Sequence, residues 1–175
     1  MAIREVRYEG DSVLRKVCKP VKAIDQKLID LMMDMEDTMR ENEGVGLAAP
    51  QIGILRRCVV IDPHDGSDTF YMVNPEIVDS EGEQDCVEGC LSVPNKRGLV
   101  KRPYRVVCRY FDLEGNEIEL DAEGFLANII CHELDHLDGT LYIDKAKMLS
   151  DKEYAEYLSQ LDDEYEEEAN EQPQE

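Results

Sequence analysis

The sequence predicts a domain of the α+β class, because helical and strand-like patterns occupy separate stretches of the chain. An amphipathic helical pattern comes first, short β-rich runs follow, and an apolar helical segment that contains HELDH comes next. With 175 residues, the chain is long enough for one hydrophobic core. We therefore expect a single domain over residues 1–165 and an acidic, disordered tail over residues 166–175.

The first helix is expected over residues 24–39. Its apolar residues recur at steps of three and four, with Asp, Lys and Glu between them, so one face of the helix is apolar. These residues are Ile24, Leu28, Leu31, Met32, Met35 and Met39. Asp25 stands at the start of the pattern and is the expected N-cap. Gly44, Gly46 and Gly53 then interrupt the helical pattern.

The middle of the chain is expected to form β-strands. Residues 58–62 (CVVID) and 70–78 (FYMVNPEIV) are rich in β-branched and aromatic residues, which favour strands. The segment 98–124 predicts two further strands joined by the turn Glu114-Gly115-Asn116.

The helical period returns from Phe125 in FLANIICHELDHLDG. This stretch is apolar on nearly every face until HELDH, so the helix must be central to the fold, and Gly139 is suited to end it. A last helix is expected over residues 151–165, lying on the body of the domain. Its apolar face would consist of Tyr154, Tyr157, Leu158, Leu161 and Tyr165. The acidic stretch after it is too polar to fold alone.

The composition limits the partners of the chain. No segment approaches the roughly 20 apolar residues of a spanning helix, and the charged start does not resemble a signal peptide. We therefore expect a cytoplasmic protein without membrane contact, whose six cysteines stay reduced. The net charge of −21 would repel a polyanion, so no direct nucleic-acid binding is expected. One basic cluster is interpreted as a solvated hairpin face: Lys96, Arg97, Lys101, Arg102 and Arg105.

The segment HELDH predicts a metal site. His132 and His136 are four positions apart, which on a helix places both imidazoles on one face and suits them to chelating one ion. Glu133 follows the first histidine and is placed to act as a general base on a water at the metal. The chain is therefore expected to be a metal-dependent hydrolase of an amide bond.

A catalytic metal site needs a third protein ligand and one open position. No histidine follows His136, so the candidates are Asp138, Asp144 or a cysteine thiolate elsewhere. Among the cysteines, Cys90 in EGCLSVP is favoured because it lies outside the helix that carries the histidines. Spacing alone leaves these alternatives open.

Three motifs together resemble the signature motifs of peptide deformylase. They are GVGLAAPQIG at residues 44–53, EGCLS at residues 88–92 and HELDH at residues 132–136, in that order and without a departure. The resemblance covers roughly residues 5 to 148. It implies antiparallel β-sheets packed around a central helix that carries HELDH. It also implies an enzyme that removes the N-formyl group from the N-terminal formylmethionine of newly made proteins and releases formate.

The resemblance also implies roles for individual residues. Cys90, His132 and His136 would be the metal ligands, and Glu133 the general acid and base. The side-chain amide of Gln51 and the backbone N–H of Leu91 would form the oxyanion hole. The expected ion is Fe(II), which zinc, nickel or cobalt can replace.

Substrate-binding residues are expected around the first two motifs. In the family, an extended peptide pairs with the chain near the first motif, here Gly44, Val45 and Gly46. In the second motif, Glu88 and Gly89 precede Cys90; Glu88 would pair with Arg102, or Arg97 would meet the carboxyl end of the substrate. Surface salt bridges are the alternative for both arginines.

The pocket for methionine is expected on the helix that carries HELDH. Phe125 and Ile129 lie seven and three positions before His132, on its helical face, and are the expected lining. Asn128 shares this face, and its side chain would either cap the pocket or turn toward protein. Simple core packing is the alternative for all three.

Two other functions compete with deformylation. An HExxH endopeptidase would use a third ligand other than Cys90, and an inactive binding module would lack Glu133 and Gln51. The expected partners are formylmethionyl peptides and nascent chains. Transient association with the ribosome is expected to avoid the acidic tail, because ribosomal RNA would repel it.

Overall fold

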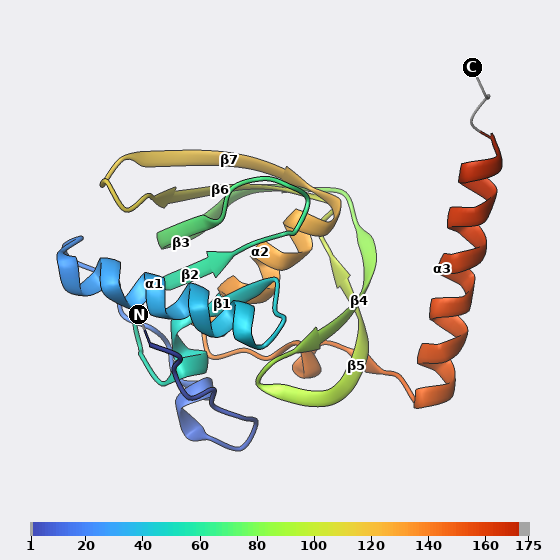
Figure 1. Cartoon of the computed structure of the whole chain (residues 1–175), viewed down its shortest axis with the longest axis horizontal. Helices are drawn as coiled ribbons and strands as arrows, with labels where there is room; N and C mark the ends of the chain where they lie inside the picture. The colour runs from blue at the N-terminus through green and yellow to red at the C-terminus, as the bar shows by residue number, and fades with distance from the viewer. Residues whose placement is uncertain (1, 172–175) are drawn as a thin grey trace.

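The chain folds into two antiparallel sheets and a set of helices, which confirms the predicted α+β class (Figure 1). The computed structural model describes residues 2–171, with side chains described as far as Leu161. The strands are β1 (Gly46–Ala48), β2 (Cys58–Ile61), β3 (Phe70–Glu81), β4 (Gln84–Cys90), β5 (Val93–Arg102), β6 (Arg105–Phe111), β7 (Glu117–Glu123) and β8 (Lys147–Met148). The five-stranded sheet has the order β1-β2-β3-β6-β7, and the three-stranded sheet has the order β4-β5-β8.

Three α-helices and three short 3-10 helices join these strands. The α-helices are α1 (Gln26–Glu41), α2 (Gly124–Leu137) and α3 (Asp151–Glu171), and the 3-10 helices are η1 (Ser12–Arg15), η2 (Ala49–Ile52) and η3 (Tyr142–Asp144). Figure 1 shows α2 in the middle of the body, between the five-stranded sheet and the hairpin of β4 and β5. The apolar helix is therefore central, as its sequence predicted.

Helix α1 covers one face of the five-stranded sheet. Its buried side chains Leu28, Met32 and Met35 pack with residues of β1 and β2, so the methionine-rich face is core packing. The carboxylate of Asp25 accepts a hydrogen bond from the N–H of Leu28 at 2.9 Å, which confirms the predicted N-cap.

Helix α2 forms the main core with the opposite face of this sheet. Ala127, Ile130 and Leu134 belong to one cluster of buried residues with side chains from β2, β3 and β6. The helix ends at Leu137, and Gly139 follows it with a φ of 73°. An added Cβ at Gly139 would lie 2.6 Å from the carbonyl oxygen of Arg15, so only glycine fits this turn without a shift.

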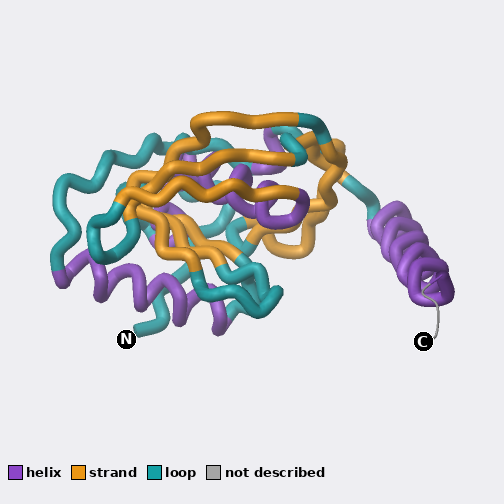
Figure 2. The backbone as a smooth tube through the Cα atoms, turned by 90° about the horizontal axis from the view of Figure 1, so that it is seen from above, coloured by secondary structure: helices purple, strands orange, loops and turns teal. Residues whose placement is uncertain are grey.

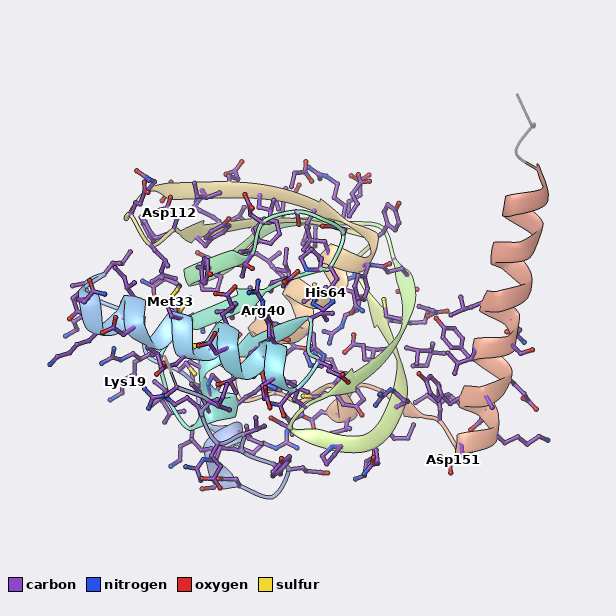
Figure 3. All side chains as sticks on the ribbon, viewed as in Figure 1. Lys19, Met33, Arg40, His64, Asp112 and Asp151 are labelled. Atoms are coloured by element: carbon purple, nitrogen blue, oxygen red, sulfur yellow. The ribbon has the colours of Figure 1, made fainter. Side chains whose placement is uncertain are left out.

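The strand predictions were right for β2, β3, β6 and β7 but incomplete elsewhere. The turn between β6 and β7 holds Asp112, which accepts hydrogen bonds from the backbone N–H groups of Glu114 and Asn116 (Figure 3). The segment 98–124 contains the end of β5 as well as β6 and β7, so it forms three strands and not two. Strand β4 was not predicted, because its polar and glycine residues obscure the β pattern.

The prediction that α3 lies on the body was wrong for the part of the helix that the structure describes. Figures 1 and 2 show α3 projecting away from the sheets, and Leu158 on it is 43% exposed. The Arg97 guanidinium lies 5.7 Å from the ring centroid of Tyr154, near the start of the helix, and is a contact to the body. The helix continues to Glu171, past the expected end near 165, because Glu and Ala favour helices strongly. Residues 172–175 of the expected tail lie outside the described residues.

The basic cluster does not form one cationic face. Lys101 pairs with Glu83, Arg105 pairs with Asp121, and the side chain of Arg102 is buried. The six cysteines are free thiols, and five of them are buried. In the described part of the chain, no helix is long and apolar enough to cross a membrane.

Candidate metal centre and active site

Two elements bring three potential metal ligands together. His132 and His136 project from α2, and Cys90 ends β4. Their candidate ligand atoms all lie within 4.8 Å of one another, with Cys90 Sγ 3.3 Å from Nε2 of His136. Among the His, Cys, Asp and Glu side chains that the structure describes, these three are close enough together to hold one metal ion. Two imidazoles and one thiolate are ligands that suit a divalent transition-metal ion of borderline softness.

The alternative third ligands lie elsewhere. Asp138 accepts a hydrogen bond from Nη1 of Arg57 at 2.7 Å. Asp144 forms an ion pair with Arg15 and accepts a hydrogen bond from the backbone N–H of Leu141. Both carboxylates therefore have structural partners outside the cluster.

A buried chain of charged groups orients His132. Oε2 of Glu88 lies 2.7 Å from Nδ1 of His132, and the guanidinium of Arg102 donates to both oxygens of Glu88 at 2.7 and 3.0 Å. Arg102 also donates to Asp135 on α2. Burial opposes the charge on Glu88, but the hydrogen bonds from His132 and Arg102 outweigh it and lower the pKa of Glu88. The pairing of Glu88 with Arg102 is thus present and buried.

The pKa values of the two histidines are shifted in opposite directions. Burial lowers the pKa of His136 well below its usual value, which favours the neutral imidazole that binds metals. Burial acts in the same direction on His132, but hydrogen bonds to Cys90 and Glu88 raise its pKa well above the usual value. The Nδ1 atom of His136 is buried without a hydrogen-bond partner in the described structure.

Glu133 lies beside the three potential ligands and is buried. Its Oε2 atom has no hydrogen-bond partner among the described residues. Burial raises the pKa of Glu133 to about 7, a value suited to both accepting and releasing a proton near neutral pH. Strand β1 makes room for this side chain, because a Cβ at Gly46 would lie 2.5 Å from Oε1 of Glu133.

Gln51 is held with its NH2 group toward Cys90. Its Oε1 accepts the backbone N–H of Ala48 at 2.8 Å, a contact that only the amide oxygen can make. The Nε2 atom lies 3.2 Å from Oγ of Ser92 and 3.5 Å from Sγ of Cys90. Leu91 follows Cys90 in the turn after β4, so both expected oxyanion donors belong to segments beside the cluster.

A cavity of about 580 Å³ opens onto this cluster. Its lining includes the residues expected to bind substrate: Gly44, Val45, Gly46, Glu88, Gly89, Arg97, Phe125 and Ile129. Phe125 is 57% exposed, whereas Ile129 is buried. A Cβ at Gly89 would lie 2.5 Å from Nη1 of Arg97, so the arginine side chain lies across the glycine backbone.

Some residues near the site were missed by sequence reasoning. Ser92 contacts Gln51, Asp135 contacts Arg102, and the ring of Tyr142 stacks with that of His132 at a centroid distance of 5.9 Å. Ser92 and Asp135 lie within the second and third motifs, so the motifs contained a signal for them. Nothing in the local sequence marks Tyr142.

The sequence and fold are similar to those of known deformylases. Residues 3–152 match the family described as polypeptide deformylase. Peptide deformylase of Agathobacter rectalis is 54% identical over 147 residues, covering 84% of this chain and 92% of the relative. That of Thermoanaerobacter pseudethanolicus is 52% identical over 161 residues, covering 92% and 100%.

Solved structures agree with this relationship. A peptide deformylase from Legionella pneumophila has 42% identity and a TM-score of 0.80, covering 98% of this chain and 100% of that one. The enzyme from Thermotoga maritima has 38% identity and a TM-score of 0.80, covering 83% and 98%. The chain therefore belongs to the polypeptide deformylase family, metal-dependent hydrolases that remove the N-formyl group from the N-terminal methionine of newly made proteins.

Proposed function

We propose that Cys90, His132 and His136 of this chain hold one divalent ion at which the formyl amide of formylmethionyl peptides is hydrolysed. The observation that carries the proposal is the meeting of these three side chains beside the buried carboxylate of Glu133. Such an ion supplies a Lewis acid that lowers the pKa of water and polarises a carbonyl group.

The side chains around the cluster supply the proton transfers and the charge stabilisation. Oε2 of Glu133 takes a proton from the attacking water and later delivers it to the departing amine nitrogen. Its pKa of about 7 supports both transfers. The NH2 group of Gln51 and the backbone N–H of Leu91 donate to the negative oxygen that develops on the formyl carbon.

The cavity lining supports a role in holding the peptide. Gly44, Val45 and Gly46 would pair with an extended substrate backbone, with Gly89 facing the same space. Ile129 and Phe125 would contact the methionine side chain. Arg97 would meet the carboxyl end of a short substrate. Glu88 has both oxygens engaged, so its role would be to orient His132.

Release of formate from formyl-Met-Ala-Ser tests this function. The metal-loaded protein should release formate, and Glu133→Ala should lower the rate by at least about a hundredfold while keeping the metal. No release with metal bound at stoichiometry would sink the proposal. Cleavage of an unformylated peptide in its interior would indicate the endopeptidase instead.

We propose Fe(II) as the ion in the cell, with zinc, nickel or cobalt able to replace it. A ferrous centre with a thiolate ligand should lose activity in air, because oxygen oxidises iron and sulfur. Anaerobic purification followed by elemental analysis tests the identity of the ion; zinc as the main metal would contradict it.

We also propose that the protein acts in the cytoplasm on nascent chains. Contact with the ribosome would be transient and would not use the acidic C-terminal segment.

A further inference from the structure

Asn128 is a polar residue in the wall of the cavity beside the potential metal ligands. It lies on α2 one turn before His132 and is only 7% exposed. The same cavity is lined in part by the apolar residues Val45, Val87 and Ile129. Asn128 is therefore a nearly buried polar residue in a cavity wall that is partly apolar.

The Oδ1 atom of Asn128 is buried and has no hydrogen-bond partner among the described residues. A buried polar atom without a partner is costly, and an apolar side chain of the same size at this place would avoid that cost. The Nδ2 atom has no hydrogen-bond partner among the described residues either, but it is not among the buried unpartnered atoms, so the NH2 group is accessible from the cavity that Asn128 lines. The cost of the unpartnered oxygen is offset if the NH2 group gains a partner when substrate is bound.

The substrate supplies one suitable acceptor in this cavity. In the proposed function, the methionine side chain of the peptide enters this cavity and contacts Ile129 and Phe125. The thioether sulfur is the only polar atom of a methionine side chain, and it accepts hydrogen bonds but donates none. The cavity offers a donor, and the substrate offers an acceptor.

We propose that the side-chain NH2 group of Asn128 donates a hydrogen bond to the thioether sulfur of the substrate. Asn128 is thus a specificity-determining residue that makes the enzyme distinguish methionine from apolar side chains of the same shape. This inference rests on the proposed function, because it requires the first side chain to enter the cavity.

The test compares formyl-Met-Ala-Ser with formyl-norleucyl-Ala-Ser, in which a methylene replaces the sulfur. Because the two side chains have nearly the same size, steric changes affect both substrates alike. The ratio of kcat/KM for methionine over norleucine should fall by roughly two- to fivefold in Asn128→Leu, because sulfur is a weak acceptor.

A second asparagine at the cavity provides a matched control. The amide of Asn42 already donates to the carbonyl oxygen of Thr38 at 2.7 Å. Asn42→Ala should therefore leave the methionine to norleucine ratio unchanged. A ratio that is unchanged in Asn128→Leu, or that falls equally in both variants, overturns the proposal.

Stability gives an independent readout. Asn128→Leu should unfold at the same temperature as the parent protein or a higher one, because it removes an unpartnered buried oxygen. A clearly lower unfolding temperature, or failure to fold, would show a structural role for the amide and overturn the proposal. Failure of the proposed function is distinguishable, since the parent protein would then release formate from neither substrate.

Discussion

Oε2 of Glu88 lies 2.7 Å from Nδ1 of His132. Glu88 comes from β4 and His132 from α2, so this contact joins the hairpin to the central helix. A carboxylate at Nδ1 holds the imidazole in the tautomer whose Nε2 lone pair is free for a metal, and it raises the basicity of that nitrogen. Without an ion, the same contact raises the pKa of His132, so a metal must displace the proton on Nε2 and then binds an oriented, strongly basic nitrogen.

Glu88→Gln should weaken metal binding by roughly tenfold or more. Glutamine keeps the shape of the side chain, but its neutral oxygen raises the basicity of His132 less than a carboxylate does. Competition with a chelator of known affinity measures the change. Asp135→Asn is the matched control, because Asp135 contacts the same Arg102 without contacting His132. An equal loss of affinity in both variants would contradict a direct effect through His132.

Gly46→Ala should lower kcat by about a hundredfold and leave the metal content unchanged. The new Cβ would lie 2.5 Å from Oε1 of Glu133 and 2.9 Å from Cδ and Cγ, so the carboxylate must move. Gly44→Ala is the comparison, because its Cβ would lie 3.0 Å from the movable end of Leu91. Formate release and metal analysis on both variants check this prediction. Equal losses of kcat would speak against displacement of Glu133.

The cluster of potential ligands was predictable from local patterns. A helix is enough to place His132 and His136 on one face, because they are four positions apart. The apolar residues of α2 predict that helix. Spacing could not choose Cys90 over Asp138 or Asp144, because that choice depends on how β4 is placed against α2. The resemblance to a family made the choice, and the geometry agrees with it.

Other features depended on contacts between distant segments. Arg102 was interpreted both as part of a solvated hairpin face and as the partner of Glu88. The pairing with Glu88 is present, but the contact with Asp135 on α2 and the burial of Arg102 were not predicted. The position of α3 was wrong because an apolar face on a helix does not say whether a surface exists to cover it. Leu158 is exposed even though its spacing is that of a packed residue.

Asp34→Asn should lower the free energy of unfolding by about 1 kcal/mol at neutral pH. The carboxylate of Asp34 accepts hydrogen bonds from the backbone N–H of Ala2 at 2.6 Å and from Nε of Arg4 at 2.8 Å. Burial opposes its charge, but these contacts lower the pKa of Asp34 below the usual value. They attach the N-terminal segment to α1.

This prediction has a definite pH dependence. Because the pKa of Asp34 is lowered in the folded protein, its contribution is complete above the unfolded pKa of about 4 and is lost as the pH falls through the folded pKa. The difference between parent and Asp34→Asn should therefore shrink between about pH 5 and pH 2 in urea unfolding. A difference that stays constant over this interval would show that the carboxylate charge is not responsible.

Removing residues 151–175 should leave ribosome association unchanged or make it slightly stronger. This segment carries acidic residues throughout and Lys152 as its single basic residue, so a surface of ribosomal RNA repels it. Truncation keeps β8, which pairs with β5 through Gly98 and Met148, and the domain should stay folded. Pelleting with ribosomes at low and high salt checks the prediction, and any gain should disappear at high salt because the repulsion is screened. A clear loss of pelleted protein would mean that α3 binds the ribosome despite its charge.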